Sequence, residues 1–302
     1  MPVITVTGLK KNFQEKEVIK GLDFNLENGK CTALIGPNGS GKSTTLRMLS
    51  GLIKPSSGEI KFQNESNFRD IRKYIGYLPQ FPVFHDWMTG PEFLQYVGQL
   101  GGLSKGISKQ RSEELLILVG LADAKKMRIG KYSGGMKQRL GIAQAIIHDP
   151  KLVMLDEPVS ALDPFGRREV LELLGRLKED KTILFSTHIL NDAEEVCDNI
   201  LFLHNGIIVE SGSMSELRSR HHQQKIVMEF AEGTKEFVAS LTSEYKDESC
   251  TIEGNQVTFI VKDIEQAKTA FLRKIVDKNM PLIRFEVGRL TLEDVFLKVV
   301  QK

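Results

Sequence analysis

The sequence is poor in cysteine, since Cys31, Cys197 and Cys250 are the only three in 302 residues. They are odd in number and too far apart for a CxxC pair, which excludes a disulfide framework and a cysteine zinc site and favours reduced thiols in the cytosol. Packing must therefore hold the fold together. Hydrophobic residues make up 41% of the chain, which is the share found in ordinary globular proteins.

Long apolar runs and a large net charge are also lacking. Nowhere do 18 consecutive apolar residues occur, so we do not expect the chain to cross a membrane by itself. Its first residues do not form a basic start followed by an apolar run, so we do not expect export. The formal net charge of +2 is too small for the field that general nucleic-acid binding needs, and no nucleic-acid partner is expected.

What the sequence does contain is a regular alternation of strand-like and helix-like segments. Strand patterns occur at residues 3–7, 22–26, 31–35, 59–63, 152–155, 182–186 and 199–203. Helical patterns occur at residues 43–52, 164–178 and 189–196, and helical spacing with glycine breaks dominates residues 91–149. This βαβ spacing predicts an α/β fold with a mostly parallel sheet.

A polar, basic stretch at residues 218–224 interrupts this pattern and predicts a linker. We therefore expect one domain at residues 1–220 and a second at 221–302. The remainder predicts strands at 225–230, on both sides of a turn at 253–255 and at 281–287, and helices at 234–245, 264–277 and 291–299. The order βαββαβ, with a terminal helix, predicts a small α+β domain of ferredoxin-like type.

A glycine-rich segment matches GxxxxGK[ST] at every defined position. It consists of Gly36, Pro37, Asn38, Gly39, Ser40, Gly41, Lys42 and Ser43, and Thr44 follows it. The segment lies between a predicted strand and a predicted helix, where backbone N–H groups and the helix N-terminus attract phosphate. Lys42 is expected to reach the β and γ phosphates and the Ser43 hydroxyl to bind Mg²⁺. The full match favours nucleotide binding over a glycine-rich turn without function.

Two acids follow the apolar strand at residues 152–155. Ligands of open α/β sheets bind at the carboxyl ends of strands, so Asp156 and Glu157 are placed to act on one. We expect Asp156 to hold Mg²⁺ and Glu157 to polarise the attacking water. The alternative is a surface turn, which the phosphate-binding segment in the same chain makes the weaker interpretation.

Four further motifs indicate which family of nucleotide-binding proteins the chain resembles. In chain order they are Tyr77-Leu78-Pro79-Gln80, Ser133-Gly134-Gly135-Met136-Lys137-Gln138-Arg139, Ser160-Ala161-Leu162-Asp163 and Ser186-Thr187-His188. They resemble the Q-loop, the signature sequence, the D-loop and the switch histidine of ATP-binding cassette (ABC) ATPases. The motifs stand in that family's order over residues 1 to about 220. The resemblance implies a P-loop NTPase core with an antiparallel β edge region and a helical subdomain at about residues 80–150.

The resemblance also implies roles for individual residues. Ser133, Gly134 and Gly135 complete the ATP site of a second subunit, and a simple helix cap is the alternative. Gln80 reaches the metal or the water and links it to the helical subdomain, unless it is an ordinary loop residue. His188 donates to the γ-phosphate, unless it is structural.

At other positions the match to the family's motifs is weaker or the residue differs. Phe13 stands where the family has its adenine-stacking aromatic, although a lone aromatic near a turn is commonplace. The family's LSGGQ reads YSGGM here, with Tyr132 and Met136 at the changed positions. A thioether has no amide donor, so the contact of the family's glutamine is lost.

A cluster of aromatic and soft side chains follows Gln80. It consists of Phe81, Phe84, Trp87 and Met88, which form either a groove for a partner helix or part of the local core.

In functional terms the chain resembles the cytoplasmic ATPase subunit of a membrane transporter. This implies ATP and Mg²⁺, a second ATPase subunit in a homodimer, and a separate permease that holds the protein at the inner face of the membrane. The YSGGM variant and the segment at residues 285–297 resemble exporters of drugs, antibiotics, peptides or lipids. One alternative is a soluble cassette ATPase acting on DNA or ribosomes, which usually has a coiled coil or two cassettes. The other is a non-hydrolysing regulatory module, against which the intact catalytic set counts.

Overall fold

The computed structural model describes residues 2–62, 68–160, 162–220, 224–231, 249–289 and 294. The chain divides into two compact units, Met1–Met214 and Ser215–Lys302, which we call the first and second units. Each has a hydrophobic core of its own. Among the described helices, none combines the length and apolar character needed to span a bilayer.

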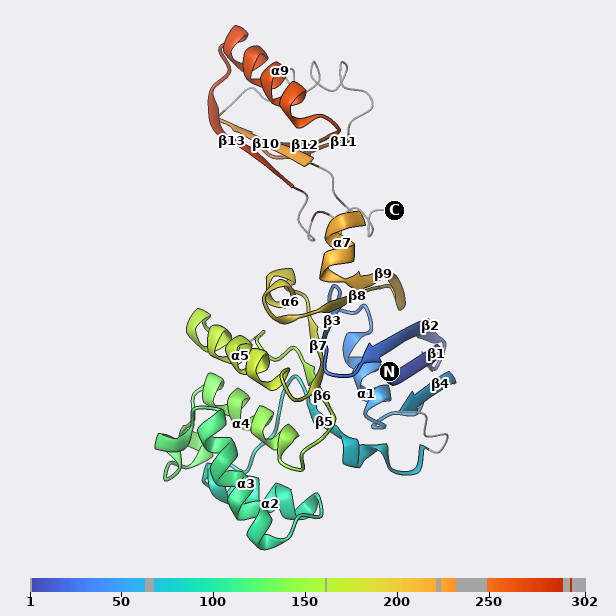
Figure 1. Cartoon of the computed structure of the whole chain (residues 1–302), viewed down its shortest axis with the longest axis vertical. Coiled ribbons are helices and arrows are strands. Elements are labelled where there is room, and N and C mark those ends of the chain that lie inside the picture. The colour runs from blue at the N-terminus through green and yellow to red at the C-terminus, as the bar shows by residue number, and fades with distance from the viewer. Residues whose placement is uncertain are drawn as a thin grey trace. The chain divides into compact units, whose positions relative to one another are not determined.

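The centre of the first unit is a mainly parallel sheet with the strand order β5-β6-β7-β3-β8-β9 (Figure 1). Its strands are β3 (Cys31–Ile35), β5 (Ile75–Leu78), β6 (Leu152–Asp156), β7 (Thr182–Thr187), β8 (Asn199–His204) and β9 (Ile207–Ser213). Only the β8–β9 pair is antiparallel. Strands β3, β6 and β7 are buried along their whole length, which explains their unbroken apolar sequences. Their carboxyl ends meet at one edge of the sheet.

The expected antiparallel region is a sheet with the order β2-β1-β4. It contains β1 (Pro2–Phe13), β2 (Lys16–Glu27) and β4 (Ser57–Phe62). The sequence predicts only short strands at 3–7 and 22–26, whereas the chain forms one long hairpin between Pro2 and Glu27. The residues near the tip of the hairpin are polar and exposed and pair across the two strands, so they show no strand pattern in the sequence.

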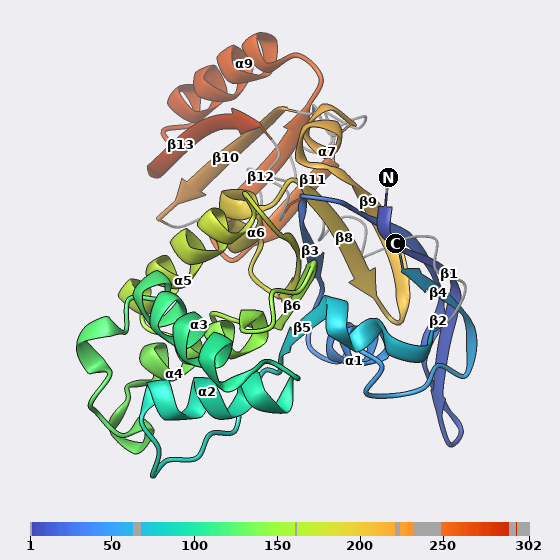
Figure 2. The same ribbon diagram turned by 60° about the horizontal axis from the view of Figure 1, so that its bottom comes forward.

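Helix α1 (Lys42–Leu49) packs its buried residues Leu46, Met48 and Leu49 into the core that both sheets of the first unit share. Helices α2 (Gly90–Leu100), α3 (Lys105–Leu118) and α4 (Gly134–Ile146) follow β5 and gather at one end of the unit (Figures 1 and 2). They are the helical subdomain that the resemblance implies. Short 3-10 helices are η1 (Phe68–Tyr74), η2 (Ala122–Ala124) and η3 (Ile129–Lys131).

Helices α5 (Pro164–Leu177) and α6 (Leu190–Val196) complete the first unit. Helix α5 begins at the cap Asp163, whose carboxylate accepts the Gly166 N–H at 2.7 Å. Helix α6 follows β7 and packs against β3 and β7. The two helices also contact each other, and so connect the segment after β6 to the segment after β7.

The second unit contains α7 (Met214–Arg220), β10 (Gln224–Phe230), β11 (Ser249–Glu253), β12 (Gln256–Val261), α9 (Ile264–Asp277) and β13 (Leu282–Arg289). Its sheet has the order β11-β12-β10-β13 with antiparallel neighbours throughout. This is the split arrangement expected of a ferredoxin-like domain. Helix α9 buries Ala267, Phe271 and Ile275 against the sheet.

The linker expected before this unit differs from the structure, and two helices expected within the unit are not tested by it. Of the linker expected at 218–224, residues 218–220 belong to α7 and Gln224 begins β10, so these described residues are part of regular elements. The helices expected at 234–245 and 291–299 lie outside the described residues, apart from residue 294.

Candidate functional site

The phosphate-binding segment forms a tight loop between β3 and α1. A side chain at Gly36 would place its Cβ 2.1 Å from the carbonyl oxygen of Leu203, so only glycine fits there. Gly39 and Gly41 have φ values of 81° and 110°, a region that side chains rarely adopt. The glycines at these positions therefore follow from backbone geometry, and the loop leads directly into the N-terminus of α1.

Lys42, the first residue of α1, lies beneath this loop. Its ammonium donates to the carbonyl oxygens of Gly36 at 2.7 Å and Pro37 at 3.3 Å. It also lies 3.2 Å from Oε1 of Glu157, and both side chains are only 5% exposed. A buried cation thus stands next to the loop, in direct contact with the carboxylate expected to act on water.

Asp156 ends β6 at the same edge of the sheet. Its Oδ1 accepts from the Ser43 hydroxyl at 3.0 Å and from the Ser186 hydroxyl at 2.7 Å. Its Oδ2 is buried and has no hydrogen-bond partner in the described part of the chain. A carboxylate with one unpartnered oxygen beside a serine hydroxyl fits the oxygen ligands that Mg²⁺ prefers.

Glu157 follows Asp156 with a φ of 51°, which turns its side chain away from the strand direction. Its N–H donates to the Ser186 hydroxyl at 2.9 Å. Its Oε2 lies 2.8 Å from Nδ1 of His188, which donates to this carboxylate when protonated there. The carboxylate is therefore held between Lys42 and the half-exposed His188.

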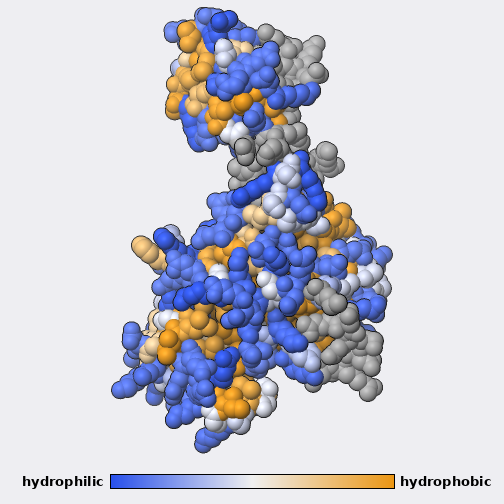
Figure 3. Space-filling view, in the orientation of Figure 1, coloured by the Kyte–Doolittle hydropathy of each residue, from blue (hydrophilic) through white to orange (hydrophobic). Residues whose placement is uncertain are grey.

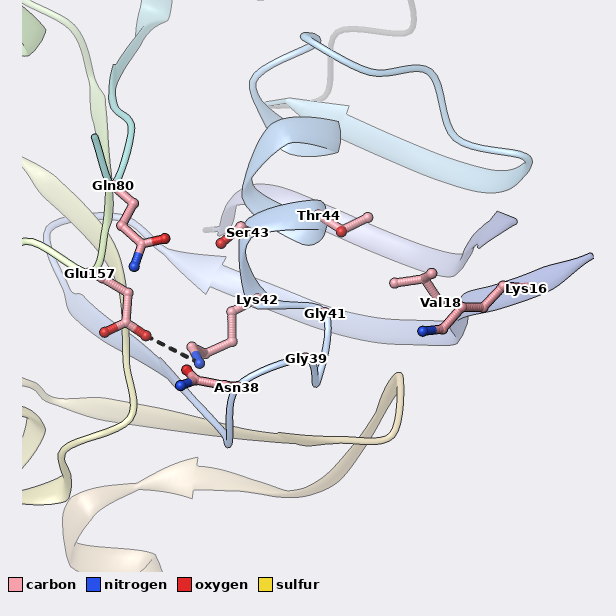
Figure 4. A pocket seen from close by; sticks show the side chains of 10 residues that line it. All are labelled: Lys16, Val18, Asn38, Gly39, Gly41, Lys42, Ser43, Thr44, Gln80 and Glu157. Carbon is pink, nitrogen blue, oxygen red and sulfur yellow. Dashed lines mark ion pairs between the residues drawn. The ribbon is translucent and has the colours of Figure 1, made fainter. Parts of the chain in front are cut away.

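Lys42, Ser43 and Glu157 line one pocket of about 490 Å³ (Figure 4). Asp156 and His188 do not line it, but they contact Ser43 and Glu157, respectively. Its lining consists of Lys16, Val18, Asn38, Gly39, Gly41, Lys42, Ser43, Thr44, Gln80 and Glu157. Gln80 lies just beyond β5, and Figure 4 shows its amide directed toward Ser43 and Glu157. The pocket is large enough to enclose part of a nucleotide.

Some of the expected site residues lie elsewhere. Phe13 ends β1, is 47% exposed and has the Lys11 ammonium 4.9 Å from its ring centroid, and it does not line the pocket. Lys16 and Val18, across the hairpin, line it instead. The sequence analysis predicts no role for either residue. Only their position a few residues after Phe13 indicates that they belong to the same part of the site.

The signature segment also lies outside this pocket. Ser133 caps α4 by accepting the Met136 N–H at 3.2 Å, and both Ser133 and Gly134 are exposed. A Cβ at Gly134 would meet no atom within 4 Å. Tyr132, which replaces the family's leucine, is buried and donates its hydroxyl to the Ala124 carbonyl at 3.2 Å. The segment therefore presents a capped helix start on an open surface.

A second layer of polar contacts fixes the end of β7, next to His188. Asp192 on α6 is fully buried and paired with Arg167 of α5 at 2.5 Å. The Thr187 hydroxyl donates to Asp192 at 3.4 Å. Burial raises the pKa of Asp192, although Arg167 and Thr187 act in the opposite direction. The pair thus ties α5 and α6 to the residue that precedes the switch histidine.

We expect Arg167→Ala to lower the free energy of unfolding by about 1–3 kcal/mol at neutral pH, because Asp192 is left buried without its cation. The folded-state pKa of Asp192 lies above its unfolded value, so its contribution to stability is present below the unfolded pKa and is lost as the pH rises through the folded pKa. The variant raises this pKa further. The difference from the parent protein should therefore shrink as the pH falls toward about 4.

Urea unfolding of both proteins at the two pH values measures this effect. Arg168→Ala is the matched control, because the Arg168–Glu172 pair is exposed and its loss should cost less than about 1 kcal/mol. An equal loss for Arg167→Ala at both pH values would show that Asp192 is not the group responsible.

Comparison with known proteins places the chain in a family. A family model described as "ABC transporter" matches residues 19–160. Over 300 residues the chain is 44% identical to YxlF, an uncharacterized ABC transporter ATP-binding protein of Bacillus subtilis (strain 168), with 99% of each chain covered. This chain belongs to the ABC transporter ATP-binding proteins. A second model, the C-terminal domain of DrrA1-3-like ATP-binding proteins, matches residues 212–300 of this ABC protein.

Other relatives agree with this assignment. The ABC protein is 31% identical to LnrL of Bacillus subtilis (strain 168), a linearmycin resistance ATP-binding protein, with 98% of each chain covered. It superposes with a TM-score of 0.63 on a dimeric post-hydrolysis state of the cassette MJ0796 bound to ADP and Pi. The identity is 27%, and 70% of this chain and 98% of that chain are covered. The protein is an ABC ATPase, and the alternative of a soluble ATPase acting on DNA or ribosomes finds no support among these relatives.

Proposed function

We propose that two copies of this ABC ATPase enclose ATP between them, hydrolyse it and thereby drive a separate membrane permease. The observation that carries the proposal is the convergence of Lys42, Asp156, Glu157 and Gln80 around one pocket at the edge of the sheet. These residues come from segments far apart in the sequence. A nucleotide-binding fold without hydrolysis would not need a buried carboxylate held between a lysine and a histidine.

Each residue has a distinct part in this proposal. Ser43, Asp156 and Gln80 would hold Mg²⁺, which neutralises phosphate charge when bound. Lys42 and the N–H groups of the phosphate-binding loop hold the phosphates. Glu157 orients and polarises the attacking water, and His188 donates to the γ-phosphate. In the described structure Glu157 already contacts Lys42 and His188, so a substrate phosphate would enter between groups that are positioned in advance.

The signature segment supports the pairing of two copies. Ser133 and Gly134 present an open helix start, and they do not line the pocket of their own chain. A second copy placed head to tail would bring this helix start, with its partial positive charge, to the phosphates. The dimeric MJ0796 cassette provides a precedent in the family.

A cluster of exposed apolar side chains supports the permease contact. Phe81, Val83 and Trp87 follow Gln80 directly and are 76%, 88% and 68% exposed. Phe84 instead packs edge-on against Phe93, with 5.3 Å between ring centroids, so it belongs to the core of the helical subdomain. The two interpretations of this cluster therefore each apply to some of its members. Phe81 and Trp87, together with the neighbouring Val83, suit an apolar partner helix that would sense movement at Gln80.

We expect Trp87→Ala to weaken binding to the proposed permease by at least about tenfold, because a buried aromatic anchor dominates an interface. Co-purification and a titration in detergent measure the effect, while the ATPase rate of the isolated subunit should not change. Ile117→Ala, an equally exposed site on α3, is the control. Equal binding by both variants would remove Trp87 from the contact.

The named relative suggests a direction of transport. LnrL is described as a linearmycin resistance ATP-binding protein, and removal of a compound from the cell is one way in which a transporter confers resistance. We propose that this ABC ATPase likewise powers export of a drug, antibiotic, peptide or lipid. It would then lie at the cytoplasmic face of the membrane, held there through the permease.

We further propose that residues 1–220 form an ATP-binding domain and residues 221–302 an accessory domain that holds no catalytic residue. The separate cores of the two units support two domains, although the compact units meet a few residues earlier, between Met214 and Ser215. A fragment of residues 1–220 should remain soluble and bind ATP, as measured by calorimetry. Failure of this fragment to fold, when the full chain folds, would place the terminal segment within the ATPase core.

A further inference from the structure

Strand β13 forms one edge of the sheet in the second unit. In the described part of the chain, its only sheet neighbour is β10. The backbone groups along the other side of an edge strand are available to pair with a further strand. A long edge of this kind is normally covered or protected, so its side chains indicate what it is built to meet.

The centre of β13 has a self-complementary sequence, Ile283-Arg284-Phe285-Glu286-Val287. Arg284 and Glu286 form an ion pair with each other, and both side chains are about half exposed. Ile283 and Val287, which flank them, are 64% and 43% exposed. Figure 3 shows apolar surface on the flank of the second unit that carries β13 and α9 in Figure 1.

We propose that β13 pairs antiparallel with β13 of a second copy of this chain, around a two-fold axis at Phe285. In this register Arg284 of each copy stands opposite Glu286 of the other, so two opposite-charge pairs form across the axis. Ile283 of each copy stands opposite Val287 of the other and is covered by it. The two sheets become one continuous sheet, and the interface is isologous, as two-fold symmetry requires.

The charges on β13 favour this register over the slipped and parallel registers. An antiparallel slip of two residues would place Glu286 opposite Glu286 or Arg284 opposite Arg284. A parallel, in-register pair would do both. A slip of one residue would turn the apolar side chains to the wrong face. A strand protected only against aggregation needs charge, but it does not need opposite charges placed symmetrically about its centre.

This contact would hold two copies together without nucleotide. It is therefore separable from the ATP-dependent pairing of the first units, and it can be tested on the full-length chain in the absence of ATP. Analytical ultracentrifugation should show a concentration-dependent dimer. A chain that stays monomeric up to about 100 μM, well above the range of a specific contact, would overturn the proposal.

Charge reversal tests the register. Arg284→Glu and Glu286→Arg each place like charges opposite one another, so each should raise the dimer dissociation constant at least tenfold. An equimolar mixture of these two variants should dimerise again, because every cross-strand pair in the mixed dimer joins opposite charges. Within each chain of that mixed dimer, positions 284 and 286 still carry like charges, so recovery cannot come from repair of the intrachain pair.

The matched controls lie on the opposite side of the sheet. Lys262→Glu after β12 and Glu253→Arg on β11 make comparable charge changes at exposed positions and should leave the dimer unchanged. Circular dichroism and ATP binding check that all variants are folded. If the reversed variants dimerise as well as the parent, or if their mixture fails to recover, β13 does not pair in this way.

Cysteine cross-linking supplies a second measurement. A mixture of Ile283→Cys and Val287→Cys chains should form a disulfide-linked dimer on mild oxidation, because directly opposed residues bring their Cβ atoms within about 5.5 Å. Each variant alone should cross-link far less. Equal cross-linking of the single variants and the mixture would contradict the register.

Discussion

Replacing Glu157 with glutamine should slow ATP turnover by at least ~100-fold while ATP binding is preserved, since general-base catalysis contributes on the order of 10² to 10⁴ in rate. Glutamine has nearly the same shape and keeps a hydrogen-bonding group toward His188, but it cannot take up a proton from water. The structure makes this substitution informative because the Glu157 side chain is buried and held on both sides, by Lys42 and by His188.

The same variant tests the pairing of two copies. If hydrolysis normally reopens the dimer, a chain that binds ATP without hydrolysing it should accumulate as an ATP-bound dimer, which light scattering detects at saturating ATP and Mg²⁺. Glu172→Gln, an exposed carboxylate on α5, is the matched control and should hydrolyse normally. Normal turnover by Glu157→Gln would exclude Glu157 as the base, and a monomer at saturating ATP would count against the sandwich.

The parts of this site that the sequence predicts are those fixed by local geometry. A loop that allows only glycine at Gly36, and a fully apolar strand that ends in Asp156, leave a signal in consecutive residues. The parallel sheet follows from the same kind of signal, because strands buried on both faces have unbroken apolar sequences. For these features, reading the chain in order was sufficient.

The parts that the sequence does not predict depend on which strands become neighbours. Ser186 links Asp156 and the Glu157 backbone only because β7 lies beside β6. Strand order is set by tertiary packing and has no local signature, so no role for the Ser186 hydroxyl was predicted. The long hairpin of β1 and β2 was missed for a related reason: its polar tip is stabilised by pairing between strands rather than by its own propensity.

Lys42→Ala should weaken ATP binding by about 10- to 100-fold, because a hydrogen bond to a charged group contributes about 1.5–3 kcal/mol. The ammonium lies at the base of the phosphate-binding loop, where it donates to the carbonyl oxygens of Gly36 and Pro37. Alanine removes the point charge from the site. The fold should survive, because α1 keeps its buried residues Leu46, Met48 and Leu49 in the core.

Calorimetric titration with ATP measures the change, and Lys16→Ala separates a specific phosphate contact from a general effect of positive charge. Lys16 lines the same pocket but is exposed, so solvent and salt screen its charge and its loss should weaken binding far less. Raising the ionic strength should reduce the Lys16 effect more than the Lys42 effect, because buried charges are screened less. Unchanged ATP affinity in Lys42→Ala would refute the assignment of the phosphate-binding loop, since Lys42 is the one cation among the described lining residues that donates to the backbone of the loop.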